Sequence, residues 1–180
     1  MIPTEHQCKK LWEKYNLPEY KKRHVAFVAR VALYLATQLK IKTLNFKINE
    51  QLLIAGALLH DIDKNIPKNS SEQHPDTAVR ILREEGMEEV AELVKTHSLY
   101  AILDSAISPK TWEEKLLYLA DKMVKQEIIT VDKRFALWND EHLHLDAQAT
   151  LDAAYLKVKE LEKEIFDRIG LKPGDIAKLA

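Results

Sequence analysis

The sequence contains little of what sheets, disulfide frameworks and flexible linkers require. Its single cysteine, Cys8, cannot form a disulfide within the chain, which suits a reducing cytoplasm. Only four glycines and six prolines leave few places for hairpin turns, and no pair of strands is evident. Leu, Ala, Glu and Lys, which favour helices, dominate instead. We therefore expect one all-α domain spanning all 180 residues.

The chain also lacks an excess of either charge and a long apolar run. Lys and Arg number 27 against 28 Asp and Glu, which argues against a general nucleic-acid binder. The longest mostly apolar stretch, residues 25–36, is interrupted by Arg30 and is too short to cross a bilayer. The amino terminus is polar and does not resemble a signal peptide. We expect a cytoplasmic protein with neither nucleic-acid nor membrane partners.

Helical periodicity and capping signals divide the chain into helices. Thr4 with Gln7, and Thr111 with Glu114, have the spacing of capping boxes, and Asn49 is a further N-cap candidate. Gly170 marks the end of the last helix. The predicted helices cover residues 5–15, 19–39, 50–64, 75–85, 88–97, 112–126 and 146–169, with a short turn from Thr130 through Phe135 to Trp138.

The stretch 52–64 is the most informative one, because eight apolar or small residues lead directly into His60 and Asp61. Ionisable groups at the buried end of a helix are unfavourable unless something pairs with them. A metal ion is one such partner, and a histidine with a carboxylate is a common ligand pair. Gly56 in the same helix weakens it relative to alanine, so we expect it to permit close approach of another helix.

Other polar residues lie on otherwise apolar helical stripes. These are His24, His97 and Asp121, while His74 stands just before Pro75 at a predicted helix start. Taken singly, each has a simpler explanation as a hydrogen-bonded core residue or a helix cap. Together they favour a metal centre, because each buried polar group needs a partner and one ion can serve several of them.

The order of these residues resembles that of the HD superfamily of metal-dependent phosphohydrolases. The resemblance covers about residues 20–137 and is carried by His24, by Leu-Leu-His60-Asp61-Ile-Asp-Lys and by Leu-Ala-Asp121-Lys. His74 and His97 match the branch with six ligand positions, which includes bacterial symmetrical diadenosine tetraphosphate hydrolases. The chain departs from that branch where Asp63 replaces a small residue, and after Asp121, where the expected Pro-Gly turn is missing. The substrate is therefore left open.

The resemblance implies an HD-type helical bundle with one or two divalent transition-metal ions. One ion would be held by His24, His60, Asp61 and Asp121, and Asp61 would bridge to a second ion held by His74 and His97. Mixed nitrogen and oxygen ligands suit iron, which is the leading choice, and also Mn, Co, Ni or Zn. A metal-activated hydroxide would then attack phosphorus.

Asp61 and Lys64 are the catalytic candidates, because Lys64 follows His60 by one helical turn and is expected to hold a phosphate group. Lys68, Lys122 and Arg134 are weaker candidates, and for Lys68 and Lys122 a solvated surface position is favoured. Asp63 either orients Lys64 or a ligand histidine, or is exposed. We expect surface positions for the remaining histidines, and packing roles for the tryptophans and Tyr118. Tyr100 and Phe135 are candidates for contact with a base, but no feature of the sequence shows such a contact. The remaining histidines are His6, His142 and His144.

The leading hypothesis is a phosphohydrolase that acts on a nucleotide or a related phosphate ester or anhydride. Its expected partner is a small phosphorylated substrate. Two alternatives stay open, namely a di-iron oxygenase of the HD type and a non-catalytic nucleotide-binding regulatory module with a structural metal. The apolar stripe of residues 146–169 fits either packing on the bundle or a homodimer contact.

Overall fold

The computed structural model describes residues 1–141 and 144–179, and these form α-helices and short 3₁₀ segments without a β-strand. The prediction of an all-α fold is confirmed. In chain order the elements are α1 (Glu5–Lys14), α2 (Glu19–Lys42), α3 (Glu50–Leu59), α4 (Asp76–Glu84), α5 (Glu88–Lys95), η1 (Leu99–Leu103), α6 (Trp112–Lys122), α7 (Val131–Asn139), α8 (Leu145–Ile169), α9 (Pro173–Ile176) and η2 (Ala177–Leu179).

The predicted helix starts are present as local hydrogen bonds. Thr4 and Thr111 each form a capping box with the residue three positions later, and the Asn49 side chain accepts a hydrogen bond from the backbone of Leu52. Such caps satisfy backbone N–H groups that have no partner within the helix. Gly170 ends α8 in the left-handed region at φ 67°, where glycine is favoured over other residues.

Two predicted helices end at least a full turn earlier than expected. The helix predicted for 50–64 stops at Leu59. In a continuing helix, the backbone N–H of Asp61 would donate to the carbonyl of Ala57. Here the ring of His60 donates to that carbonyl instead. The helix predicted for 112–126 stops at Lys122, where the chain turns back and forms an isolated bridge between Val124 and Ile128.

The carboxyl-terminal part contains more helix than the sequence pattern predicted. The predicted short turn after Thr130 is the full helix α7, with Thr130 as its N-cap. The short helix α9, which begins at Pro173, was not predicted. α8 runs one residue earlier than predicted, from Leu145, and packs against α2, α6, α7 and η1.

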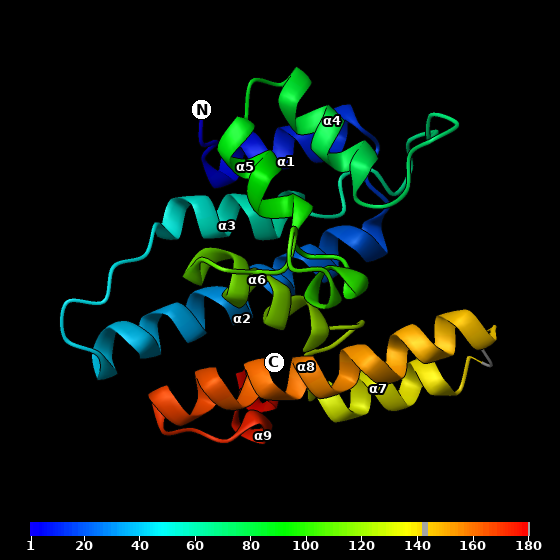
Figure 1. Cartoon of the computed structure of the whole chain (residues 1–180). Helices are drawn as coiled ribbons and strands as arrows, with labels where there is room; N and C mark the ends of the chain where they lie inside the picture. Colours follow the sequence, from blue (N-terminus) through cyan, green and yellow to red (C-terminus); the bar gives the residue numbers. More distant parts are fainter. Residues whose placement is uncertain (142–143, 180) are drawn as a thin grey trace.

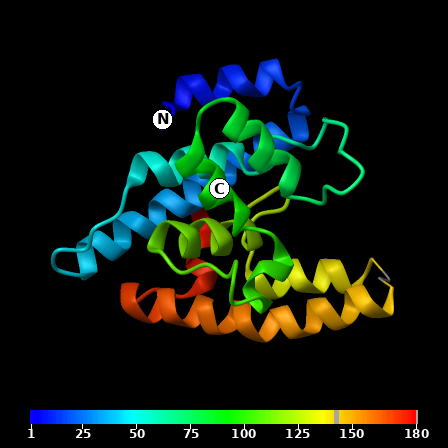
Figure 2. The ribbon, with the colours of Figure 1, turned by 45° about the horizontal axis from the view of Figure 1, so that its top comes forward.

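The helices enclose two apolar cores that share α3. Leu53 and Ala57 of α3 contribute to a core built mainly with α2, α6 and α8. Ala55 and Leu58 contribute to a second core with α1, α4 and α5. Figures 1 and 2 show α1, α4 and α5 on one side of the molecule and α7 and α8 on the opposite side. A helix that is buried on both sides explains the nearly continuous apolar sequence before His60.

Gly56 lies where α3 meets α5. A Cβ atom at this position would come within 2.5 Å of Leu93 Cδ2 on α5, closer than real contacts allow. The predicted close approach of a second helix at Gly56 is therefore confirmed. This contact fixes α5 against α3, and His97 follows α5 directly. Within the described ranges, no helix combines the length and the apolar character needed to traverse a bilayer.

Candidate metal centre

Six side chains from separate parts of the chain meet at the carboxyl end of α3. His24 extends from the first half of α2, and Asp121 from the last turn of α6. His60 caps α3 and Asp61 follows it. The fifth and sixth come from segments flanking α4 and α5, namely His74 and His97. We call His24, His60, Asp61, His74, His97 and Asp121 the ligand cluster.

The Nδ1 atom of each histidine in the ligand cluster faces a group that can only accept a hydrogen bond. His24 Nδ1 lies 3.1 Å from the carbonyl oxygen of Lys125, and His60 Nδ1 lies 2.8 Å from that of Ala57. The other two acceptors are Asp63 Oδ2 for His74, at 3.0 Å, and the carbonyl of Val94 for His97, at 2.5 Å. Because carbonyls and carboxylates only accept, each Nδ1 carries the proton. When the ring is neutral, its Nε2 atom keeps a lone pair; at His24 this atom faces Asp121 Oδ1 at 3.0 Å, so a proton or a cation must lie between them.

These four Nε2 atoms point toward one another and toward the two carboxylates. His74 Nε2 and His97 Nε2 are 2.9 Å apart, a separation at which two lone pairs repel unless a cation lies beside them. His60 Nε2 is buried and has no hydrogen-bond partner. A buried polar nitrogen without a partner is unfavourable. A metal ion that accepts these lone pairs would give each nitrogen a partner and remove the repulsion between them.

The spacing between the ligand atoms suits a small divalent ion. Nitrogen and oxygen atoms that share an ion at 2.0–2.2 Å lie about 3.0–3.5 Å apart. His24 Nε2 is 3.0 Å from Asp121 Oδ1, and His60 Nε2 is 3.4 Å from the same oxygen. His24, His60 and Asp121 form one group whose ligand atoms lie within 4.8 Å of one another. The residues present thus fit a divalent metal.

The two oxygens of Asp61 face different halves of the ligand cluster. Oδ2 lies 3.9 Å from His24 Nε2 and 3.8 Å from His60 Nε2, whereas Oδ1 lies 3.6 Å from His74 Nε2. Asp61 also belongs to two further groups of metal-ligand spacing, with His60 and His97, and with Asp63 and His74. A carboxylate placed in this way has the geometry of a bridge between two ions.

The charges of the ligand cluster are strongly coupled. Burial alone raises the pKa of the Asp61 carboxyl, but the charges of His60, Lys64 and Lys21 lower it overall. The pKa of Asp121 is likewise lowered, against the effect of burial, chiefly by Lys122 and His24. Both carboxylates are therefore ionised and available as ligands.

The pKa values of His60 and His97 are shifted in opposite directions. Burial lowers the pKa of His60, but Asp61 and Asp121 outweigh it and raise the value above the ordinary one. The pKa of His97 is well below the ordinary value, because it is buried beside His60 and His74. The half of the cluster near the two carboxylates thus attracts a positive charge, and a bound metal would supply that charge in place of a proton.

A sequence comparison assigns this arrangement to a family. The profile of the HD domain matches residues 22–125, which is more than half of the chain. The chain belongs to the HD domain family. The matched stretch contains the entire ligand cluster, and the superfamily resemblance seen in the sequence is confirmed.

A curated relative contains a region similar to this HD chain. The chain is 28% identical over 189 positions to a tRNA (cytidine(56)-2′-O)-methyltransferase of Picrophilus torridus. The alignment covers 98% of this chain and 50% of that protein, so the chain spans about half the length of the curated relative. No solved structure matches the chain.

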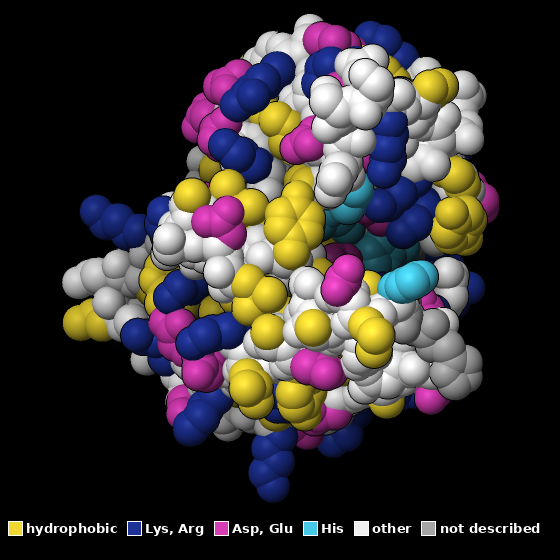
Figure 3. All heavy atoms as spheres, turned by 45° about the vertical axis from the view of Figure 1, so that its right-hand side comes forward, with side chains coloured by type: hydrophobic (Ala, Val, Ile, Leu, Met, Phe, Trp, Pro, Cys, Tyr) yellow, Lys and Arg dark blue, Asp and Glu magenta, His cyan; other side chains and the backbone are white. Residues whose placement is uncertain are grey.

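The ligand cluster of the HD domain opens into a cavity of about 180 Å³ with basic side chains around its mouth. Lys21, Lys64 and Arg134, which we call the cationic rim, line this cavity together with Trp138. Figure 3 shows histidine side chains deep in a hollow on this face, with Lys and Arg side chains beside it. A positive mouth above a metal-ligand cluster favours an anionic ligand.

Two members of the cationic rim touch Asp61. Lys64 lies at the surface with Nζ 3.2 Å from Asp61 Oδ1, so it faces the cavity as predicted, although it lies on the turn after α3 and not on that helix. Lys21 Nζ lies 2.7 Å from Asp61 Oδ2 and was not predicted. Its position three residues before His24, on the same face of α2, was the available signal.

The prediction that Lys122 lies on the solvated surface is wrong. A solvated position was favoured, but the side chain is only 2% exposed. Its ammonium group donates to Asp121 Oδ2 and to the carbonyl of His97, each at 2.6 Å. Burial lowers the pKa of Lys122 in spite of the carboxylate beside it. Lys122 therefore links two members of the ligand cluster, whereas Lys68 is exposed as predicted.

Asp63 takes the orienting role that the sequence left open. It is 3% exposed, and its Oδ2 atom receives the Nδ1 proton of His74. A carboxylate behind a ligand histidine fixes the ring orientation and strengthens it as a ligand. The aspartate that departs from the family pattern thus supports His74 in this chain.

None of the other described residues considered from sequence belongs to the ligand cluster. His6 and His144 are exposed, and His142 lies outside the described residues. Tyr100 is 38% exposed and donates to the carbonyl of His74 at 3.4 Å. The packing roles expected for the aromatic residues are supported for Trp12, whose indole donates to the carbonyl of Leu58, and for Tyr118, whose hydroxyl donates to that of Leu99.

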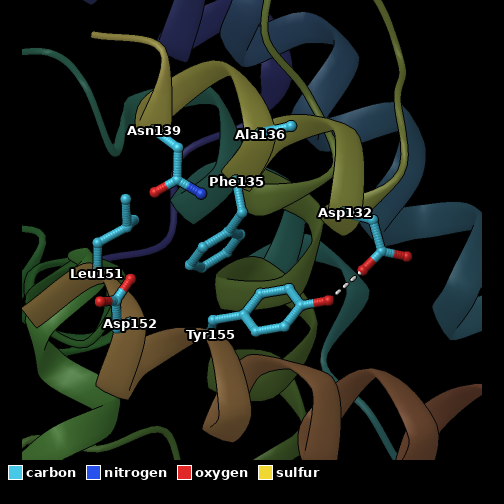
Figure 4. Close-up of a pocket in the computed structure, with 7 residues that line it drawn as sticks. All are labelled: Asp132, Phe135, Ala136, Asn139, Leu151, Asp152 and Tyr155. Carbon is cyan, nitrogen blue, oxygen red and sulfur yellow. Dashed lines mark hydrogen bonds between the residues drawn. The ribbon is translucent and has the colours of Figure 1, made fainter. Parts of the chain in front are cut away.

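A second cavity, of about 270 Å³, lies between α7 and α8 (Figure 4). Phe135, Tyr155 and Asp132 line it, and Tyr155 donates to Asp132 Oδ1 at 2.8 Å. No histidine is among its lining residues, and the metal-ligand groups found in the described ranges consist of the ligand cluster and the neighbouring Asp63. This cavity marks the contact that holds α7 against α8.

Proposed function

We propose that this HD domain is a metal-dependent hydrolase of a phosphate ester or anhydride bond in a nucleotide or a related compound. The observation that carries the proposal is the convergence of four histidine Nε2 atoms and two carboxylates beneath the cationic rim. A site of neutral imidazoles and carboxylates suits transition metals, and a positive mouth suits a phosphate.

In the proposed site, His24, His60, Asp61 and Asp121 would hold one divalent ion, and a second ion would be held by His74 and His97 together with Asp61. Iron is the leading choice of metal. Such an ion supplies Lewis acidity toward a phosphoryl oxygen and lowers the pKa of a bound water toward neutrality. The spread of ligands over both oxygens of Asp61 supports the bridging role.

The surrounding side chains position the ligands and the substrate. Asp63 and three backbone carbonyls fix the tautomers of the histidines, so no ring has to reorient before the reaction. Lys122 holds Asp121 in place. Lys64, at the mouth of the cavity, binds a phosphate oxygen and stabilises the negative charge that shifts during transfer.

The test is an assay of metal-replete protein against a substrate panel, with metal content measured on the same preparation. The panel holds nucleoside mono-, di- and triphosphates, a symmetrical dinucleoside tetraphosphate and a short RNA with a terminal phosphate. The RNA is included because the Picrophilus relative is named for tRNA. We expect phosphate release from at least one nucleotide. Protein with confirmed bound metal that cleaves no member would contradict the proposal.

The two other hypotheses make different predictions for the same preparation. A di-iron oxygenase would consume oxygen with a candidate substrate and release no phosphate. A regulatory module would bind a nucleotide without turnover. The cationic rim agrees with the hydrolase, because its three side chains, which are among the four basic residues that line the cavity, are suited to an anionic substrate.

A further inference from the structure

Arg134 differs from the other basic residues of the pocket in having no ionic partner. Lys21 and Lys64 contact Asp61, and Lys122 contacts Asp121. Within the ranges 1–141 and 144–179, no carboxylate forms an ion pair with Arg134, and its buried Nε atom has no hydrogen-bond partner. A half-buried guanidinium group without an anion is unfavourable, because its charge is partly removed from water.

The side chain of Arg134 is held in a defined orientation. Its guanidinium carbon lies 4.4 Å from the centre of the Trp138 ring, one helical turn later on α7. Stacking on an indole occupies the flat face of a guanidinium group and leaves the N–H groups at its edge available. Both residues line the cavity above the ligand cluster.

α7 itself is fixed from behind by α8. Phe135 lies edge-to-face with Trp138 on one side and with Tyr155 of α8 on the other, at ring separations of 5.1 Å in both cases. Asp132 accepts a hydrogen bond from Tyr155 at 2.8 Å, which Figure 4 shows, and another from Lys159 at 3.1 Å. These contacts place Arg134 before any ligand arrives, so little ordering accompanies binding.

We propose that Arg134, stacked on Trp138, is a specificity-determining residue that binds the phosphate oxygens of the substrate. The inference rests on the proposed function and extends it, because Arg134 lies outside the family match of residues 22–125. The planar fork of arginine matches two phosphate oxygens at once. Burial lowers the pKa of Arg134, although the charges of Asp121, Glu141 and Asp61 act in the opposite direction.

The size of the cavity narrows the class of substrate. Pockets that enclose a whole drug-sized ligand usually measure about 300–1,000 Å³. At about 180 Å³, this cavity encloses a phosphate group and little more. We therefore assign a substrate whose terminal phosphate enters between the ligand cluster and Arg134, while its organic part stays at the mouth beside Trp138.

The experiment measures the affinity of inorganic phosphate for Zn²⁺-loaded protein by isothermal titration calorimetry. Arg134→Gln is expected to weaken phosphate binding by at least about tenfold, the usual effect of losing a charged hydrogen bond. Arg134→Lys is expected to weaken it less, because the charge remains while the fork is lost. The matched control is Arg168→Gln, since Arg168 also lies over an indole, 5.1 Å from Trp112, outside the pocket.

Thermal stability and zinc content are measured for every variant. A purely structural role for Arg134 predicts lower stability with unchanged phosphate affinity, and that result overturns the inference. Wild-type protein that does not bind phosphate, or equal weakening in Arg168→Gln, overturns it as well. Loss of phosphate affinity in Arg134→Gln, but not in Arg168→Gln, supports the inference. This result is independent of whether any member of the substrate panel is cleaved. Failure of the inference and failure of the proposed hydrolase can therefore be distinguished.

Discussion

The ligand cluster and the cationic rim are adjacent but are built differently. Residues of the ligand cluster are mostly buried. The Nδ1 atom of each histidine is held by a hydrogen bond to a backbone carbonyl or, for His74, to the carboxylate of Asp63. The cationic rim is more exposed, and it draws Arg134 from α7, outside the family match. We infer that the cluster determines the type of chemistry and that the rim determines which phosphate compound is accepted.

The largest effect is expected from the cluster. Asp61→Asn keeps the size of the side chain but removes the charge that two ions would share. We expect loss of bound metal and a fall in hydrolysis of more than about 100-fold, beyond the range seen for residues that only support a ligand. Elemental analysis and the phosphate-release assay measure both. The control is Asp167→Asn on the exposed face of α8. Full activity in Asp61→Asn would exclude the proposed site.

A smaller effect is expected from Asp63→Ala, which removes the acceptor that fixes His74. Loss of such a supporting carboxylate usually weakens metal binding or activity by about 10–100-fold. We expect the ion at His74 and His97 to be lost first, so that a titration with metal shows one weakened site and one unchanged site. Equal weakening of both sites, or of neither, would contradict the division of the cluster into two halves.

Substitutions in the cationic rim should weaken substrate binding without loss of metal. Lys64→Met is expected to raise KM about tenfold through loss of a charged contact to phosphate, while metal content stays at the wild-type level. Lys68→Met, on the same exposed loop but not among the residues that line the cavity, is the control and should change neither quantity. A loss of metal in Lys64→Met would show that cluster and rim are not separable.

The smallest effect concerns Glu162, which belongs to neither region. Burial raises the pKa of this carboxyl although Lys159 is its hydrogen-bond partner. A raised pKa in the folded state means that the protonated form favours folding, and this stabilisation is lost as the pH rises through the folded value. At neutral pH the ionised group opposes folding, so Glu162→Gln should stabilise the protein by up to about 1 kcal/mol.

Thermal unfolding at two pH values measures this effect. The gain in Tm for Glu162→Gln should be present at pH 7 and disappear near pH 4, where the wild-type carboxyl is protonated. Glu160→Gln, which changes an exposed carboxyl of the same helix, serves as the control. A gain that is equal at both pH values would show that the charge of Glu162 is not its cause.

Sequence reasoning located the cluster because its chemistry interrupts apolar stripes. His24, His60 and Asp121 stand where a core residue would otherwise be, and such positions are visible without coordinates. The caps at Thr4 and Thr111 were predictable for a similar reason, since their hydrogen bonds are local. The all-α fold followed from composition and helical periodicity.

The parts that were missed depend on contacts distant in sequence. Lys21 resembles an ordinary surface lysine at a helix start, and its ion pair with Asp61 appears only when α2 meets α3. The burial of Lys122 depends on the carbonyl of His97, 25 positions away. The end of α3 at Leu59 could not be predicted because the ring of His60 competes for the backbone of the last turn.

The most direct test of a metal centre is anomalous diffraction from crystals of the wild-type protein loaded with iron or manganese. The account predicts a peak about 2.0–2.2 Å from the Nε2 atoms of His24 and His60, with a second peak beside His74 and His97. Fully metal-loaded crystals that show no peak within reach of these four Nε2 atoms would contradict the central claim.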